Sequence, residues 1–372
     1  MPRDGKVRIG IIGCGGIARG SHAPSYKQLQ AAGVCELVAC CDVVPEVAQD
    51  FAREFELPRV FTDYRDLLAL DDLDGVSVAT PPFVHKEATV AALRAEKHVL
   101  CEKPMAMNVA EAKEMLSAAR ETGKVLTIGH GSRFSPTAQE IHRRSQAGEL
   151  GEIYYARAAR LRRRGVPSWG VFTSKALNGG GPLIDIGVHA LDLAVWLMGN
   201  PQPVGVYSAT YDKLAHRPGI PAQNALGTRG ARPFDPARFD VEDLCVGLIR
   251  FANGATLVLE ASWLLNQEAA EIRRTEIFGT AGSASIEPFR ILVDDGTELR
   301  DVTPPGVEAP AGRGARGAGG RSGNFLRIER FVDCIRGRAE PLVRPEESLN
   351  IQRIIDGLYQ SAESGKAVEL GD

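Results

Sequence analysis

The stretch VRIGIIGCGGIA, residues Val7 to Ala18, decides how the sequence folds. Its first half is a short apolar run typical of a buried β-strand, and its second half is a G-x-G-x-x-A pattern. Glycines at this spacing permit a tight turn and let the backbone approach a pyrophosphate closely, at the start of the helix that follows. The stretch therefore predicts a dinucleotide-binding loop, whose members are Gly13, Gly15, Gly16, Ile17 and Ala18.

An acidic residue strengthens this interpretation. Asp42 closes the next strand-like run, which begins at Leu37, and a carboxylate there can accept hydrogen bonds from the adenosine ribose and repel a 2′-phosphate. The separation from the glycines exceeds the usual ~20 residues, which a longer first helix accommodates. Val43 and Val44 follow where an arginine would clamp a phosphate, so NAD is favoured over NADP. The alternative is a structural turn followed by a surface aspartate.

Strand-like and helix-like segments alternate along the first part of the chain. This order predicts a parallel sheet covered by helices, the α/β architecture of a Rossmann dinucleotide-binding domain, over residues 1–130. The expected strands are Val7–Ile12, Leu37–Cys41, Val76–Ala79, His98–Cys101 and Val125–Gly129, and the expected helices are Pro24–Ala32, Pro45–Glu56, His85–Glu96 and Val109–Thr122.

The pattern changes after residue 130, where strand candidates follow one another. It predicts a second, α+β domain with a large, open, mostly antiparallel sheet over residues 131–372. Residues 304–323 are expected to form a loop, and the helices within residues 325–364 are expected to pack back. The expected strands are Glu152–Arg162, Val204–Thr210, Asp243–Phe251, Ala255–Trp263 and Arg273–Gly279, and the expected helices are Ser135–Ala147, Leu183–Met198, Phe325–Ile335 and Pro345–Ser364.

Composition excludes several classes of protein. The 372 residues are 44% apolar and 24% charged, with a formal net charge of −3, so nothing favours a nucleic-acid or membrane partner. No uninterrupted apolar run reaches the roughly 18 residues of a membrane span, and the N-terminus shows no signal-peptide pattern. Seven scattered cysteines lack C-x-x-C spacing, and no His/Asp/Glu cluster has ligand spacing. We therefore expect a cytoplasmic protein with neither disulfides nor a metal site.

Two further motifs follow predicted strands, at the edge where open α/β sheets bind ligands. They are ATPPFVH, residues 79–85, and CEKP, residues 101–104. His85 either lines the nicotinamide side of the site or begins the helix after two prolines. His130 and Arg133 follow a later strand end and are expected to reach cofactor or substrate. The candidate cofactor contacts on the two motifs are Thr80, Pro81, His85, Glu102 and Lys103.

Two polar residues interrupt the apolar stretch NGGGPLIDIGVHALDLAVWLMG, residues 178–199. Asp185 and His189 lie four residues apart, so on an α-helix they would share one face. They form either a hydrogen-bonded pair in the core or part of an acid–base site. Oxidation of an alcohol needs a base that removes the hydroxyl proton and titrates near neutrality, as histidine does. A dinucleotide loop in the same chain favours this catalytic interpretation.

The sequence resembles the glucose–fructose oxidoreductase/inositol dehydrogenase (Gfo/Idh/MocA) family. The resemblance covers nearly the whole chain, because several independent motifs occur in the family's order. They are GCGGIA, ATPPFVH, CEKPMA, RFSP at residues 133–136, GELGEIYYARA and GGGPLIDIGVHALDL.

The resemblance implies a division of labour among these residues. Lys103 would lie beside the nicotinamide and hydrogen-bond the reacting hydroxyl, while Glu102 helps to hold the cofactor and its loop. His189 would be the general base, and Asp185 would orient the substrate or the imidazole. The positive charge of Lys103 would also favour the developing alkoxide. The family further implies a sugar, inositol or glycoside as substrate and a homodimer or homotetramer formed through the open sheet face.

A basic run in the second domain has two interpretations. Its members are Arg157, Arg160, Arg162, Arg163 and Arg164. The arginines either form a solvated strand end that pairs with acidic residues, or one or two of them clamp an anionic group on the sugar. Trp169, Phe172 or Trp263 could offer a ring face to the sugar. The candidate substrate contacts in the chain are His130, Arg133, Arg163, Arg164, Trp169, Asp185 and His189.

Three functions are compatible with these residues. The first is an NAD-dependent dehydrogenase acting on a secondary hydroxyl of a carbohydrate. The second is an NAD-dependent glycosidase of the kind similar to this family, which oxidises, eliminates, hydrates and reduces again with no net NADH. The third is a regulatory protein that binds the dinucleotide without chemistry, which the presence of both Lys103 and His189 disfavours.

Overall fold

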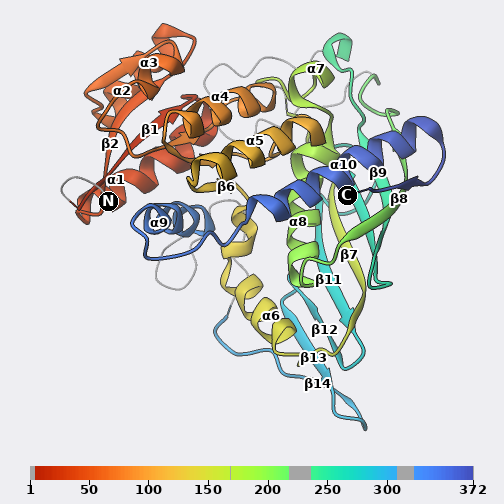
Figure 1. Cartoon of the computed structure of the whole chain (residues 1–372). Helices are drawn as coiled ribbons and strands as arrows, with labels where there is room; N and C mark the ends of the chain where they lie inside the picture. The colour runs from red at the N-terminus through yellow and green to blue at the C-terminus, as the bar shows by residue number, and fades with distance from the viewer. Residues whose placement is uncertain (1–4, 168, 218–235, 308–321, 372) are drawn as a thin grey trace. The chain divides into compact units, whose positions relative to one another are not determined.

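The computed structural model describes residues 5–167, 169–217, 236–307 and 322–371 (Figure 1). The chain forms two compact units. The first comprises residues 1–131 together with residues 322–349, and the second comprises residues 132–321 together with residues 350–372. Each unit has its own β-sheet.

Among the described residues, six parallel strands form the sheet of the first unit, in the order β3-β2-β1-β4-β5-β6. The chain adds strands on one side of β1 and then on the other, so the order reverses between β1 and β4. Ligands of open α/β sheets bind beyond the carboxyl ends of the strands at such a point. The strands are β1 (Val7–Ile12), β2 (Cys35–Cys41), β3 (Arg59–Phe61), β4 (Gly75–Val78), β5 (His98–Cys101) and β6 (Leu126–Ile128).

Helices connect these strands, and local signals set their ends. In α5 (Val109–Thr122), the Asn108 side chain accepts a hydrogen bond from the Glu111 N–H at the start, and Gly123 ends the helix with a φ of +64°. The helix α4 (Pro82–Arg94) packs against α5. Further helical segments of this unit are η1 (Ala18–His22), which is a π-helical turn, α1 (Ala23–Ala31), α2 (Pro45–Phe55) and α3 (Tyr64–Leu68).

A late segment of the chain completes the first unit. The helix α9 (Gly323–Ile335) packs against α1 and η1, and its residues Ile328 and Phe331 share a buried core with β1 and β2. The sequence predicts a single second domain over residues 131–372. The structure differs because this amphipathic helix buries its apolar face in the first unit.

In the described part of the second unit, nine strands form one sheet in the order β14-β13-β12-β11-β7-β10-β9-β8-β15. The described pairings are antiparallel except for β10 with β7, which is parallel. The strands are β7 (Ile153–Arg162), β8 (Pro203–Tyr211), β9 (Leu244–Phe251), β10 (Thr256–Ser262), β11 (Glu271–Gly279), β12 (Gly282–Ser285), β13 (Arg290–Asp294), β14 (Leu299–Asp301) and β15 (Val368–Glu369).

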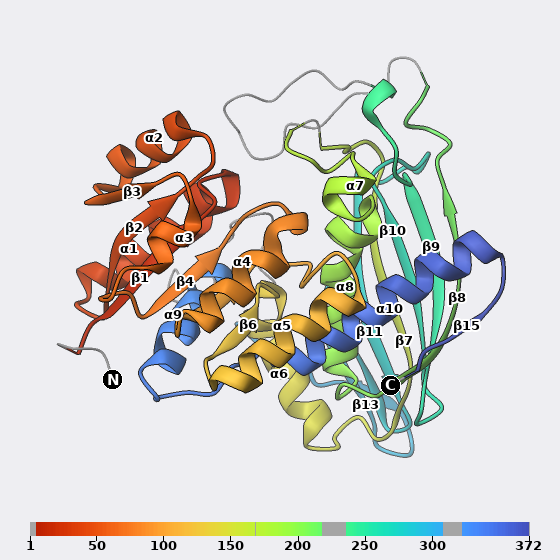
Figure 2. The same cartoon turned by 45° about the horizontal axis from the view of Figure 1, so that its top comes forward.

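One face of this sheet is covered and the other is open. The helix α8 (Val188–Leu197) contacts β7 and β11, the π-helical turn η3 (Leu183–Gly187) contacts β10, and α6 (Pro136–Gln146) packs on α8 (Figure 2). Side chains of the opposite face, such as Tyr207 and Leu248, are 54% and 41% exposed. Further segments are η2 (Gly131–Phe134), α7 (Lys175–Asn178), η4 (Pro236–Arg238) and α10 (Pro345–Ser364).

The stretch from Lys175 to Leu197 is long and apolar enough to span a membrane by length and composition alone. Most of it is buried inside the protein, since 89% of its most apolar window is covered. The stretch is therefore accounted for as the core helix of the second unit.

The fold class predicted from the sequence is confirmed: a Rossmann-type parallel sheet is followed by an α+β part with a mostly antiparallel sheet. The short strands β3 and β12 to β15 were not predicted, because segments this short carry little periodicity. The single helix predicted over Leu183–Met198 is wrong in one detail, since it begins with the π-helical turn η3. Most of the loop expected at residues 304–323 lies outside the described residues.

Candidate active site

The glycine loop joins β1 to η1 at the carboxyl edge of the first sheet. Gly13 has a φ of +94°, and a Cβ atom on it would lie 2.6 Å from the main-chain oxygen of Ala79, so only glycine fits. A Cβ atom on Gly15 would meet no protein atom within 4 Å, and Gly15, Gly16 and Ile17 are exposed. The loop thus presents open backbone to solvent, as the close approach of a pyrophosphate requires. Ala18 is buried at the start of η1.

Asp42 faces the same loop from the end of β2. One carboxylate oxygen accepts a hydrogen bond from the Cys14 N–H at 2.9 Å, and the other accepts one from the Val44 N–H at 3.0 Å. The neighbouring Val43 and Val44 are exposed apolar residues rather than cations. The site therefore offers a carboxylate for ribose hydroxyls, followed in the chain by apolar residues rather than by a cation that would bind a 2′-phosphate, which fits NAD.

His85 supports two loops of this edge. Its ring is buried, with Nδ1 2.8 Å from the carbonyl oxygen of Pro104 and Nε2 3.0 Å from that of Thr80. Burial lowers its pKa, while the hydrogen bonds with the two carbonyl oxygens oppose this shift. The predicted contact of His85 with the cofactor is therefore corrected: both ring nitrogens face main-chain oxygens, and the side chain holds the Thr80–Pro81 loop against the Lys103–Pro104 loop.

Glu102 is buried in a charged cluster that sequence reasoning missed. Its Oε1 lies 2.8 Å from Nη2 of Arg327 on α9 and 2.8 Å from Nε2 of His22 in η1. Burial raises the pKa of the carboxyl, but the Arg327 charge and the His22 hydrogen bond outweigh this and hold the pKa well below its usual range. Arg327 also donates to the carbonyl oxygen of Gly129 at 2.8 Å.

This cluster fixes the loop that carries Lys103. The Lys103 N–H lies 3.3 Å from Oε2 of Glu102, and the lysine side chain is partly exposed beyond it. Glu102 therefore acts on the loop through its buried partners, while its predicted help in holding the cofactor stays a prediction. His130 follows β6 and is only 2% exposed, so its predicted contact also stays a prediction.

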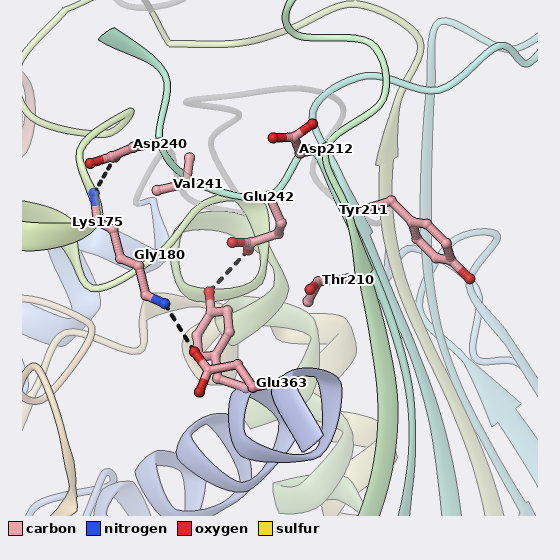
Figure 3. A pocket seen from close by; sticks show the side chains of 10 residues that line it. Lys175, Gly180, Thr210, Tyr211, Asp212, Asp240, Val241, Glu242 and Glu363 are labelled. Atoms are coloured by element: carbon pink, nitrogen blue, oxygen red, sulfur yellow. Dashed lines mark hydrogen bonds and ion pairs between the residues drawn. The ribbon is translucent and has the colours of Figure 1, made fainter. Parts of the chain in front are cut away.

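In the second unit, three consecutive glycines lead into η3, and we call residues 179–189 the GGG segment. Gly179 has a φ of +88°, and Cβ atoms on Gly180 and Gly181 would collide with the Tyr359 hydroxyl and with the main-chain oxygen of Glu242. Figure 3 shows Gly180 and Glu242 on the wall of a cavity of about 250 Å³. The glycines are therefore required by a close approach of backbone and side chains.

Asp185 and His189 stand out within this segment. From Gly180 to Met198 they alone are partly exposed among described residues that are otherwise all buried. The Asp185 carboxylate accepts a hydrogen bond from the indole N–H of Trp263 at 3.1 Å. Trp263 is completely buried, so it cannot offer a ring face to a sugar as expected; it orients Asp185 instead.

The π-helical turn changes the geometry that the spacing predicts. Asp185 lies within η3 and His189 within α8, so the two residues do not share the single α-helix on which a four-residue spacing aligns side chains. Their common partial exposure, rather than regular stacking, is what sets the pair apart in the structure.

Arg133 requires a correction. It is fully buried, and its guanidinium binds the buried carboxylate of Asp192 in two places, with Nε to Oδ2 at 3.0 Å and Nη2 to Oδ1 at 2.6 Å. The Trp196 ring lies 5.7 Å from the same guanidinium. The structure therefore places Arg133 in the core of the second unit, as the buried partner of Asp192.

The other predicted substrate contacts lie on or near the end of β7. Arg163 donates to the carbonyl oxygen of Glu268 at 3.0 Å, and Arg164 donates to the side chain of Asn266 at 2.8 Å. Trp169 is partly exposed and meets Phe172 edge to face, with ring centroids 6.0 Å apart. These arginines are directed to acceptors of the protein itself, and substrate contacts by all three residues stay predictions.

No group of three or more His, Cys, Asp or Glu within the described ranges is arranged to hold a metal ion. The structure collects the predicted cofactor residues at one edge of the first sheet: the glycine loop, Asp42, the Thr80–Pro81 loop and the Glu102–Lys103 loop. Asp185 and His189 lie together on the GGG segment of the second unit.

Comparisons with known proteins agree with this geometry. Residues 7–130 match the model of the oxidoreductase family with an NAD-binding Rossmann fold, and residues 138–285 match the GFO/IDH/MocA C-terminal domain. The chain therefore belongs to the Gfo/Idh/MocA oxidoreductase family and is an enzyme that uses NAD.

Several relatives carry named activities. The chain is 37% identical to D-glucoside 3-dehydrogenase of Escherichia coli, covering 98% of this chain and 97% of that protein. It is 31% identical to levoglucosan dehydrogenase of Pseudarthrobacter phenanthrenivorans, over 74% of this chain and 72% of the relative. Its fold matches aldose-aldose oxidoreductase of Caulobacter crescentus with a TM-score of 0.77, at 26% identity over 98% of this chain and all of the other.

We predict that Gly15→Ala weakens NAD binding about tenfold or more, equivalent to ~1.4 kcal/mol, without changing the thermal midpoint. The added methyl group meets open space in the protein and obstructs only a bound dinucleotide. Titration calorimetry with NAD measures the effect. Gly20→Ala, which also adds a methyl group in open space, is the matched control. Wild-type affinity in both variants would contradict the assignment of the loop.

We predict that Arg133→Met lowers the free energy of unfolding by about 3–5 kcal/mol, because Asp192 is left as an uncompensated buried charge. The double variant Arg133→Met/Asp192→Leu removes both charges and should recover most of the loss. Urea denaturation measures both. A stable Arg133→Met variant with a raised KM for substrate would instead restore the substrate-binding interpretation.

Proposed function

We propose that this enzyme oxidises a secondary hydroxyl of a D-glucoside or a closely related sugar, with NAD as hydride acceptor. The observation that carries the proposal is the partial exposure of Asp185 and His189 within a segment that is otherwise buried. An accessible imidazole can remove the proton of an alcohol, and an accessible carboxylate close to it in the chain can orient the substrate or the imidazole. The likeness to D-glucoside 3-dehydrogenase over 98% of the chain supports the glucoside and the hydroxyl at carbon 3.

Each of these residues would have its own role in the reaction. NAD bound at the glycine loop supplies the electrophilic ring that takes up the hydride. His189 removes the hydroxyl proton, and Asp185, oriented by the Trp263 indole, positions the sugar or the imidazole. The Lys103 ammonium favours the developing alkoxide. The buried Glu102 keeps the lysine loop in place.

The arginines near β7 favour a neutral sugar over an anionic one. Arg157 forms an ion pair with Glu276 on the neighbouring strand β11, with Nε 2.9 Å from Oε2. Arg163 and Arg164 donate hydrogen bonds to protein oxygens. An anionic ligand would have to compete with these acceptors. A sulfonated or carboxylated glucoside that binds much better than methyl glucoside would overturn this choice.

We also infer a homo-oligomer formed through the open face of the second sheet. Tyr207 on β8 lies opposite Leu248 on β9, and Leu248 lies opposite Val258 on β10, so these apolar side chains share one face. Exposed apolar surface of this kind marks protein interfaces. Light scattering should give a mass at least twice that of the chain.

The seven buried cysteines, all free thiols, are consistent with a reducing cytoplasm.

An assay of NADH formation with methyl and aryl glucosides, glucose and inositol tests the function directly. Steady NADH production with a glucoside is the expected result. Release of the aglycone without accumulation of NADH would instead identify the oxidation–elimination glycosidase. Binding of NAD with neither NADH formation nor aglycone release would favour the regulatory protein.

We predict that His189→Ala lowers kcat for the best sugar by about 10²–10⁴-fold, the usual contribution of a general base. The affinity for NAD should not change. His216→Ala is the matched control, since His216 is an exposed histidine of the same unit, paired with Asp212 at 3.3 Å. A kcat of His189→Ala close to that of the control would contradict the assignment of His189 as the general base.

A further inference from the structure

Glu242 lies buried behind the GGG segment, just before β9 (Figure 3). Its Oε2 accepts a hydrogen bond from the Gly181 N–H at 2.9 Å, and its Oε1 accepts one from the Leu183 N–H at 3.1 Å. The hydroxyl of Tyr359, on α10, donates to Oε1 at 2.9 Å. Both oxygens are therefore engaged, and two of the three donors belong to the GGG segment.

The hydrogen bonds continue from Glu242 to a predicted catalytic residue. The carbonyl oxygen of Gly181 accepts the Asp185 N–H at 3.1 Å, so Gly181 is bound to Glu242 on one side and to Asp185 on the other. Leu183 begins η3, two residues before Asp185. A displacement of the Glu242 carboxylate would thus be passed directly to the backbone of Asp185.

The surroundings leave little room for an alternative arrangement. Side chains larger than glycine are excluded at Gly180 by the Tyr359 hydroxyl and at Gly181 by Glu242 itself. Burial raises the pKa of Glu242, and the N–H groups of Gly181 and Leu183 oppose this by stabilising the carboxylate. The other acidic groups on the cavity wall bind elsewhere or are more exposed; Asp240, for example, accepts the Lys175 N–H at 2.6 Å.

We propose that Glu242, held by Tyr359, is a positioning residue for the reaction: it sets the backbone of the GGG segment and thereby the placement of Asp185 and His189. The proposal rests on the function proposed above. It differs from a purely structural role because it predicts a loss of turnover in protein that remains folded.

Glu242→Gln tests the proposal. A glutamine has one acceptor oxygen and one NH₂ group, so one of the two backbone N–H groups loses its acceptor and meets a donor instead. We expect kcat for the sugar to fall roughly 10²-fold, the effect of misplacing a reacting group by about 1 Å. The pH profile of kcat/KM should shift because His189 is displaced, while the affinity for NAD stays unchanged. The Tyr359→Phe variant keeps both acceptor oxygens of Glu242, so it should lose less activity than Glu242→Gln.

Asp240→Asn is the matched control. It makes the same change of charge on the same cavity wall, but its partner is the Lys175 N–H rather than the GGG segment. Its kcat should stay within about twofold of wild type, as for a surface substitution. A Glu242→Gln variant with a lowered thermal midpoint but wild-type kcat, KM and pH profile per folded molecule would overturn the proposal.

Hydrogen exchange separates this proposal from the proposed function. In Glu242→Gln, peptides that cover residues 181–189 should exchange faster than in wild type, while peptides of the glycine loop should not change. Unchanged exchange over residues 181–189 would overturn the proposal whether or not the enzyme oxidises a glucoside. Faster exchange in a protein whose wild type oxidises no sugar would contradict the proposed function alone.

Discussion

The buried carboxylate of Glu102 is the interaction on which the cofactor edge of the first unit depends. A charge removed from water costs several kcal/mol unless partners compensate it, and here Arg327 and His22 supply the compensation at 2.8 Å each. Those partners come from α9 and η1, so one carboxylate ties the helix after the glycine loop, the lysine loop and a late helix together. Because the cost of breaking such a pair is high, the cluster holds the Lys103 loop in place.

The second unit uses a buried carboxylate as well, with a different form of compensation. Glu242 has no cation among its hydrogen-bond partners described above; two backbone N–H groups and a tyrosine hydroxyl bind it instead. Backbone donors can reach the carboxylate only where the chain approaches closely, which explains the run of glycines ahead of Asp185. In both units, a glycine-dependent close approach and a buried acid together fix the residues that we assign to the chemistry.

The parts of this protein that could be predicted from sequence depend on local signals. The glycine loop, Asp42 and the alternation of strands and helices are each contained within a few residues or a regular period, and the Rossmann fold followed from them. The predicted helix Val109–Thr122 coincides with α5 to the residue. The polar pair Asp185 and His189 was visible because the surrounding residues are apolar.

Most of what could not be predicted depends on partners that are distant along the chain. Arg133 was expected to meet substrate, but its partner Asp192 lies 59 residues away. Arg327 and His22, which meet across 305 residues, were not recognised as parts of the site. The π-helical turn at Leu183–Gly187 has no distinct period in so short a segment, so a continuous α-helix was expected instead.

The proposed reaction transfers the hydrogen at carbon 3 of the glucoside to NAD as a hydride, and this transfer can be measured directly. The purified enzyme is incubated with NAD and methyl D-glucoside deuterated at carbon 3, and the reduced cofactor and the sugar are examined by mass spectrometry. We expect one deuterium in the nicotinamide ring of the reduced cofactor and a ketone at carbon 3 of the sugar. Reduced cofactor without deuterium would show that the hydride comes from another carbon of the sugar. If no glucoside gives reduced cofactor, the proposed dehydrogenase activity is contradicted.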